Sequence, residues 1–157
     1  MRTFITREFS KKLKLNVIRK ESLSVYAFGA KQAEEQSYNV VQIKLENRDE
    51  PSLHIELEAL GTEQISATTL PVPNINVSKA FNKLKNLQLA DCDKNKNISI
   101  LIGVAYYYEI VSGRLKQLND KLVATETIFD WCLQGYIGLT NDLLSLKIVV
   151  DERNISD

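Results

Sequence analysis

Hydrophobic residues are most concentrated in the stretch from Ile98 to Gly113, and their spacing changes within it. The first part is a β-branched run that ends at Gly103, which is typical of a strand buried on both faces. After this glycine, Tyr106 and later apolar residues recur at helical spacing until Ser112 and Gly113 end the pattern. The pattern predicts a buried strand and one short helix joined at Gly103, with the rest of the chain packed around them.

Alternation of apolar and polar residues predicts further strands. Residues 41–45 and 53–59 alternate in this way, and a turn marked by Pro51 separates them. We expect two half-buried antiparallel strands here. Residues 23–27 alternate as well and then run into a polar stretch that starts at Phe28, so this segment predicts a strand that leads into a hairpin or loop.

The N-terminal residues carry a helical pattern. Thr3 can cap a short helix in which Ile5, Phe9 and Leu13 fall at four-residue spacing on one face, while basic residues such as Arg7 face away. This basic face is expected to be solvated.

The C-terminal part contains one more strand-like segment. Residues 123–133 read as a single strand that closes at Gly135, and residues 139–157 read as a tail or the start of a linker. Together these patterns predict one mainly β domain over residues 1–138, with two or three short helices.

Composition narrows the classes of partner. A chain of 157 residues with 44% hydrophobic residues can form one domain with a core. Lys plus Arg and Asp plus Glu number 20 each, so charge gives no reason to expect a nucleic acid or an anionic membrane as partner. No apolar leader follows Met1 and no apolar run approaches the ~20 residues of a membrane span, so we expect a cytoplasmic protein in which Cys92 and Cys132 are free thiols.

Candidate chemical groups are few. His54 is the only histidine, and it lies on the polar side of a strand with Glu56 and Glu58. Two carboxylates on one exposed strand face can imitate a catalytic pair, but solvation alone explains them. These residues therefore form no complete catalytic arrangement.

One polar loop imitates the start of a calcium-binding loop. Asp93, Asn95 and Asn97 stand at alternate positions, but Ile98 replaces the required glycine and Val104 the required glutamate. The two cysteines also lack the partners that a tetrahedral zinc site needs. We expect neither a metal nor a cofactor.

Four blocks, taken in order, resemble the aspartic peptidase domain of Bel/Pao-type retrotransposon polyproteins, a retropepsin-like family. They correspond to the helix after the catalytic loop, the family's Leu-Ala-Asp approach, the second glycine-ended strand with its helix, and the closing strand. The blocks are Arg2–Thr6 with Phe9 and Leu13, Leu87–Asp91, Ile100–Gly103 with Tyr106–Val111, and Thr127–Gly135.

The resemblance implies a single-lobe β-barrel that acts as a homodimer and hydrolyses peptides with one aspartate from each subunit. Two neighbouring carboxylates share a proton, and the pair activates a water molecule. The resemblance also implies that Phe28, Gly29 and Ala30 belong to a flap that closes over an extended peptide. Its strand-end and helix block consists of Ile100, Leu101, Ile102, Gly103 and Tyr106.

The sequence departs from the family at the catalytic position. It contains no Asp-Ser-Gly or Asp-Thr-Gly, and the resemblance places that motif, with the first catalytic strand, just upstream of Met1. Neither Asp91 nor Asp93 has the small hydroxyl residue and glycine needed to replace it. Ala105 stands where the family usually has aspartate, and Asp130 where it usually has the glycine before tryptophan.

Two functions follow from this comparison. The first is an aspartic endopeptidase domain of retrotransposon origin, which processes a polyprotein and is inactive as given because its catalytic aspartate is absent. The alternative is a non-catalytic remnant that binds a peptide or dimerises. The Tyr106–Tyr108 run is interpreted as core aromatics, not as a ligand platform.

Overall fold

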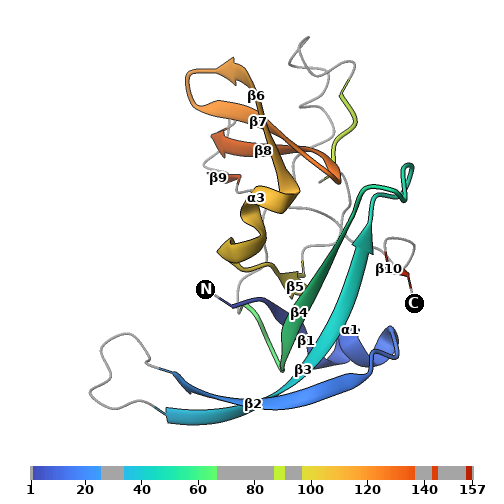
Figure 1. Ribbon diagram of the computed structural model, residues 1–157. Coiled ribbons are helices and arrows are strands. Elements are labelled where there is room, and N and C mark those ends of the chain that lie inside the picture. The colour runs from blue at the N-terminus through green and yellow to red at the C-terminus, as the bar shows by residue number, and fades with distance from the viewer. Residues whose placement is uncertain are drawn as a thin grey trace.

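A computed structural model of the protein describes residues 2–25, 34–66, 87–90, 97–136, 143–144 and 155–156. The described part is mainly β, which confirms the predicted class, and its helices are short (Figure 1). The elements are β1 (Phe4–Thr6), α1 (Arg7–Lys12), β2 (Val17–Val25), β3 (Glu34–Glu46), β4 (His54–Thr62), β5 (Ile100–Leu101), the 3-10 helix η2 (Val104–Tyr106), α3 (Tyr107–Ile110), β6 (Val111–Asn119), β7 (Leu122–Thr127), β8 (Asp130–Tyr136), β9 (Leu143–Leu144) and β10 (Ile155–Ser156).

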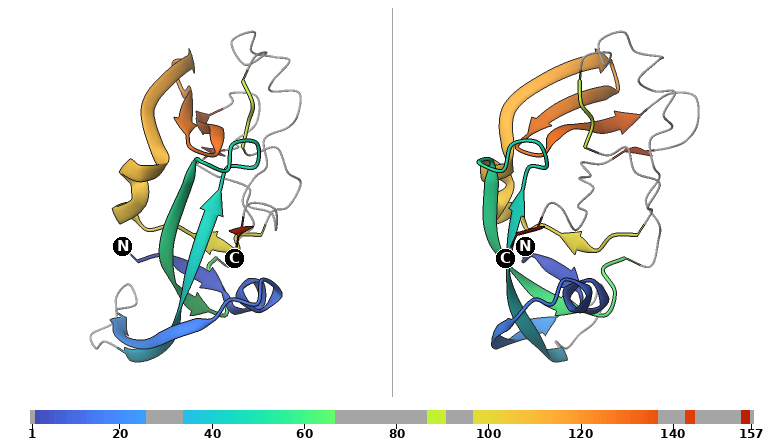
Figure 2. Two further views of the ribbon diagram at one scale, coloured as in Figure 1. Left: turned by 45° about the vertical axis from the view of Figure 1, so that its right-hand side comes forward. Right: turned by 90° about the vertical axis from the view of Figure 1, so that its right-hand side faces the viewer.

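The described strands form two sheets and no closed barrel. The larger sheet has the order β10-β3-β4-β1-β5, with β2 also paired to β3, and the smaller sheet has the order β6-β7-β8-β9. The smaller sheet lies at the end of the larger sheet that carries the β3–β4 turn (Figures 1 and 2). Short pairings also include two segments of the predicted tail, since β9 pairs with β8 and β10 pairs with β3.

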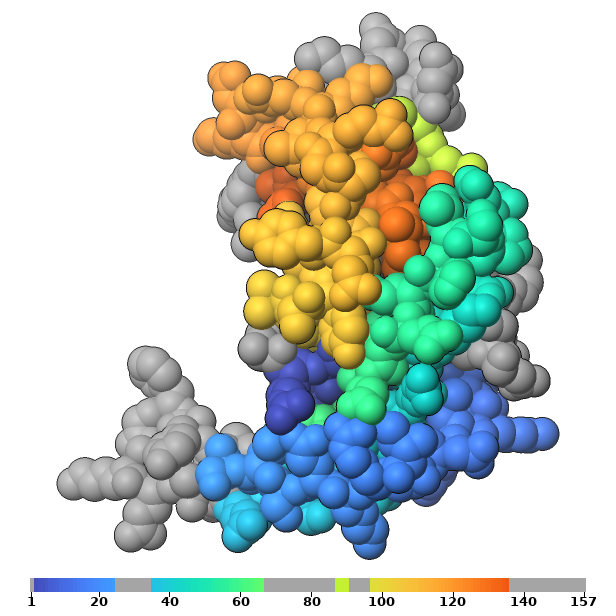
Figure 3. All heavy atoms as spheres, viewed as in Figure 1, coloured from blue at the N-terminus to red at the C-terminus, as the bar shows by residue number. Residues whose placement is uncertain are grey.

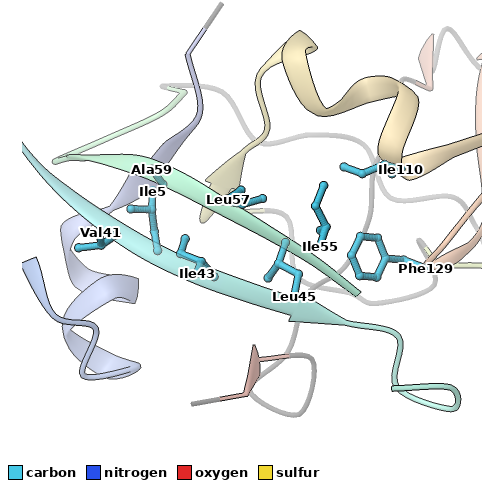
Figure 4. Packing of buried hydrophobic residues seen from close by; sticks show 9 residues of the cluster. All are labelled: Ile5, Val41, Ile43, Leu45, Ile55, Leu57, Ala59, Ile110 and Phe129. Atoms are coloured by element: carbon cyan, nitrogen blue, oxygen red, sulfur yellow. The ribbon is translucent and has the colours of Figure 1, made fainter. Parts of the chain in front are cut away.

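The main core lies on β3 and β4. Their alternation was predicted correctly: Ile43, Leu45 and Leu57 are almost completely buried, and β3 and β4 pair in antiparallel register. Ile5, Ile110 and Phe129 bring other elements to the same cluster (Figure 4). Burial of these side chains is the main source of stability for the larger sheet.

The expectation that residues 98–113 form the core was wrong. Among the described strands, β5 pairs only with β1 and lies at the edge of the larger sheet; Ile100 is half-buried and Leu101 is 36% exposed. The helix ends at Ile110, and Ser112 and Gly113 already belong to β6. Apolar composition indicated packing but not which sheet position the strand takes.

The N-terminal helix begins later than predicted. Residues 4–6 form strand β1, and Thr6, not Thr3, caps α1, because its Oγ1 accepts a hydrogen bond from the Phe9 backbone N–H at 3.3 Å. Arg7 is exposed, as expected for the basic face. Pairing with two neighbouring strands outweighs the local helical pattern over residues 4–6.

The segment predicted as one strand over residues 123–133 is a hairpin. Strands β7 and β8 pair in antiparallel register, and Ile128 and Phe129 form the turn between them. Phe129 is buried in the main core, which explains why an apolar residue can occupy a turn. Cys132 on β8 is buried, whereas Cys92 lies outside the described residues.

None of the helices in the described ranges is long and apolar enough to cross a membrane.

Candidate functional site

The N-terminal strand β1 occupies an interior position of the larger sheet, parallel to β4 and antiparallel to β5. Thr3, just before β1, is only 4% exposed, and its carbonyl oxygen accepts from the Leu60 N–H at 3.0 Å. Its Oγ1 accepts from the Gly103 N–H at 2.8 Å. Since a buried polar group needs a partner, this contact fixes the start of β1 against the segment that follows β5.

The predicted strand-end block therefore meets the N-terminus. Gly103 is buried, Ile100 pairs with Ile5, and Ile102 packs half-buried against the main core. Tyr106 is half-buried, and its hydroxyl oxygen accepts from the Glu58 N–H at 3.3 Å. The structure thus brings together the first and third of the sequence blocks that carried the resemblance.

The interpretation of residues 106–108 as core aromatics was wrong for two of the three. Tyr107 is 42% exposed and Tyr108 is 87% exposed, with their rings 5.4 Å apart in an edge-to-face contact. The neighbouring Val104 is exposed as well. Helix α3 is a single turn whose buried residue is Ile110, so it can turn only one side towards the core.

The β2–β3 hairpin is the second part of the site. Its strands pair from Val17 with Val41 to Val25 with Glu34. Phe28, Gly29 and Ala30, predicted as flap residues, lie outside the described residues. Of the two alternatives that the sequence left open, a hairpin or a loop, the pairing of β2 with β3 shows the hairpin, although β2 begins at Val17, before the predicted residues 23–27.

A network of ion pairs connects this hairpin with β1 and β4. Arg19 donates to both carboxylate oxygens of Glu58, at 2.7 and 2.6 Å, and lies 3.4 Å from Glu21, which is also 2.6 Å from Arg2. The hydrogen bonds from Arg19 lower the pKa of Glu58, and those to Glu58 raise the pKa of Arg19. The sequence pattern does not indicate this network, because the network depends on strand register.

These parts surround a step in the molecular surface. The space-filling view shows the hairpin projecting below the segment of η2 and α3, with the N-terminal residues at the corner between them (Figure 3). The hairpin lies on one side of this step, and the segment that carries the exposed Tyr107 and Tyr108 lies on the other.

The other candidate groups form no catalytic pair. His54 is exposed and lies 3.1 Å from the Ser52 carbonyl oxygen, and Glu56 and Glu58 are exposed on one strand face, as predicted. Hydrogen bonding and ion pairing with Arg19 lower the pKa of Glu58. This carboxylate is therefore unsuited to share a proton with Glu56.

The described residues give no support to a metal site or to a carboxylate that replaces the catalytic aspartate. Across the described ranges, no group of three or more His, Cys, Asp or Glu side chains could hold a metal ion. Asp91, Asp93 and Asn95 lie outside the described residues.

Asp130 has an unusual backbone. Its φ is 82°, a conformation that favours glycine, and the residue opens β8 immediately after the turn. Burial and the nearby carboxylate of Asp49 raise its pKa, partly offset by Arg48 and by a hydrogen bond from Asn47. In the family that the sequence resembles, this position is usually glycine. The backbone at residue 130 therefore suits glycine better than aspartate.

Segment 87–90, part of the block that resembles the Leu-Ala-Asp approach, lies beside β8. The Trp131 N–H donates to the Gln88 carbonyl at 3.0 Å, and the Ala90 N–H donates to the Trp131 carbonyl at 2.9 Å. Leu87 and Leu89 pack on the smaller core. The second and fourth sequence blocks are therefore also neighbours.

Comparison with protein-family models, with curated proteins and with solved structures found no match to this chain.

Proposed function

We propose that this chain forms a retropepsin-like aspartic peptidase domain of retrotransposon origin, which binds an extended peptide between the β2–β3 hairpin and the start of β1. The position of β1 carries the proposal. The block that the resemblance assigns to the helix after the catalytic loop begins instead as strand β1, which lies inside the sheet and is tied through Thr3 to the glycine-ended segment at Gly103. A loop that precedes Arg2 would emerge beside the hairpin.

Two further observations support this proposal. A glycine-ended strand, Ile100–Leu101 followed by Gly103, does lead into a short helix. Asp130 has the backbone conformation of a glycine at the family's glycine position. Both agree with the order of blocks that the resemblance uses.

The chemistry of the proposal requires a carboxylate that residues 1–157 do not carry in an Asp-Ser/Thr-Gly loop. In a homodimer, one such loop from each subunit would place two carboxylates side by side, and their shared proton would make one the base and the other the acid. Residues 1–157 by themselves are therefore expected to bind peptides without cleaving them.

A cleavage assay tests this. Residues 1–157 would be compared with the same chain carrying an Asp-Ser-Gly loop ahead of Arg2, and with an Asn-Ser-Gly version as matched control. Pooled extended peptides would be analysed by mass spectrometry. We expect pepstatin-sensitive cleavage only with the aspartate present.

Two results would contradict the proposal. Pepstatin-sensitive cleavage by residues 1–157 alone would show that the carboxylate lies elsewhere in the chain. Absence of both cleavage and peptide binding in the Asp-Ser-Gly version would remove the peptidase assignment. Mass mapping of the natural protein's N-terminus then shows which form occurs.

The second candidate function is peptide binding or dimerisation without catalysis. Strand β2 favours it, since this strand pairs with β3 alone among the described strands. An unpaired strand edge can accept another strand. A dimer in ultracentrifugation that binds peptides, from a natural protein whose N-terminus is Met1, would favour this alternative.

A further inference from the structure

The outer part of the β2–β3 hairpin extends beyond the rest of its sheet. Strand β4 pairs with β3 only over residues 40–46, whereas β2 pairs with β3 as far as Glu34. Residues 20–25 and 34–39 therefore form a two-stranded arm, visible as the projection in Figure 1. An isolated two-stranded hairpin is marginally stable in water, so side-chain contacts must help to hold the arm in place.

A β-bulge marks the base of the arm. Val17 pairs with Val41 and Arg19 with Val40, so Ile18 is an extra residue on β2. A bulge of this kind bends the strand and increases its twist. The arm is thus turned out of the sheet at the point where β4 stops supporting it.

Two contacts join the second residue pair of the arm, Glu21 and Tyr38, to the N-terminal residues. Glu21 and Tyr38 are directly paired, so their side chains share one face of the arm. Arg2 binds Glu21 at 2.6 Å, and the ring of Phe4 lies 6.1 Å from that of Tyr38 in an edge-to-face contact. Since Arg2 and Phe4 are two residues apart in an extended segment, both point to the same side.

We infer that Arg2 is a positioning residue, which together with Phe4 sets the place of the hairpin arm over the start of β1. This inference rests on the proposed function for its meaning: the arm would be held at the point where peptide and catalytic loop meet. The same two residues that follow that loop then also fix the hairpin opposite it.

The ion pair between Arg2 and Glu21 is expected to stabilise the arm more than an isolated surface ion pair would. Glu21 is only 21% exposed at its side chain, and Arg19 reinforces it at 3.4 Å while binding Glu58 with both nitrogens. Networks with bidentate arginine are the surface ion pairs that contribute measurably. Arg2, Glu21 and Arg19 therefore act together at the bend.

Amide hydrogen exchange on residues 1–157 tests the inference without requiring any activity. Glu21→Gln should raise exchange of amides in residues 20–25 and 34–39 by about two- to fivefold, the range for loss of a networked ion pair. Exchange over residues 40–46 should stay unchanged. Arg2→Gln, which leaves the contact of Arg19 with Glu21 in place, should raise exchange over the same amides, and Tyr38→Leu should add to the effect of Glu21→Gln.

Glu35→Gln is the matched control, because Glu35 is an exposed glutamate on the same arm. Unchanged exchange in Glu21→Gln with Tyr38→Leu would overturn the inference, as would an equal rise throughout the larger sheet. In the Asp-Ser-Gly version, Glu21→Gln should raise KM with little change in kcat. An Asp-Ser-Gly version that neither cleaves nor binds peptides would refute the proposed function but leave the exchange result valid.

Discussion

Two glycines with positive φ differ sharply in the space around them. A Cβ at Gly135 (φ 122°) would lie 2.0 Å from the Lys121 carbonyl oxygen, whereas a Cβ at Gly113 (φ 84°) would meet nothing within 4 Å. We expect Gly135→Ala to lower the free energy of unfolding by more than about 3 kcal/mol, since backbone must move. Gly113→Ala should lower it by about 1 kcal/mol, the effect of φ alone. Urea unfolding of both variants checks this, and equal losses would contradict it.

Asp130 combines a strained φ with a raised pKa, so its contribution to stability depends on pH. A carboxyl group whose pKa is raised on folding stabilises the fold below its unfolded pKa, near 3.8, and loses that contribution as pH rises through the folded pKa. Asp130→Asn removes the charge and still tolerates positive φ. We expect it to be more stable than the native chain at pH 7, by less than about 1 kcal/mol because the side chain is only partly buried.

Thermal unfolding of the native chain and of Asp130→Asn from pH 3 to 7 measures this difference. The gain should shrink towards pH 3, where Asp130 is protonated. Asp130→Gly is a useful second variant, because glycine removes the carboxylate and adopts positive φ without strain. A native chain more stable than Asp130→Asn at pH 7 would show that the hydrogen bond from Asn47 outweighs burial.

At the scale of elements, helix α1 ends in a Schellman motif whose critical residue is not glycine. The Leu15 N–H donates to the Ser10 carbonyl at 3.1 Å and the Lys14 N–H to the Lys11 carbonyl at 3.0 Å, while Lys14 has φ 54°. Lys14→Gly should raise the free energy of unfolding by up to about 1 kcal/mol. Lys14→Ala, which removes the charge but keeps the strain, should give no such gain in denaturant unfolding.

Strands β3 and β4 could be predicted from the sequence, whereas the cap of α1 could not. Alternation predicted β3 and β4 because both have one buried and one exposed face, as at Ile43 and Gln42. The prediction of a cap at Thr3 was wrong because the Thr3 hydroxyl accepts a hydrogen bond from Gly103, 100 residues away, and Thr6 is the cap. A local pattern cannot reveal such a partner, and the contact of Arg2 with Glu21 depends on strand pairing and the bulge at Ile18 in the same way.

At the scale of the whole molecule, the two sheets meet through the β7–β8 turn. Phe129 from this turn is buried in the core of the larger sheet, in the same cluster as Ile55 and Ile110. Beside it, the Asn47 side-chain amide donates to the Ile128 carbonyl at 2.7 Å. Asn47 is itself buried and caps the β3–β4 turn by accepting from the Asp49 N–H. The two sheets are therefore expected to unfold together.

This coupling can be tested because the chain has one tryptophan, Trp131, which packs on the core of the smaller sheet. In the native chain, Trp131 fluorescence and far-ultraviolet circular dichroism should give the same urea midpoint, as a two-state transition requires.

Phe129→Ala should lower the free energy of unfolding by about 3 kcal/mol through loss of buried contacts. Since the larger sheet keeps Ile55, Leu57 and its strand pairing, the two midpoints should separate in this variant, with fluorescence changing first. Val123→Ala, on the same hairpin but half-buried and outside this cluster, should leave them coincident. Coincident midpoints in Phe129→Ala would mean that contacts other than the turn couple the sheets.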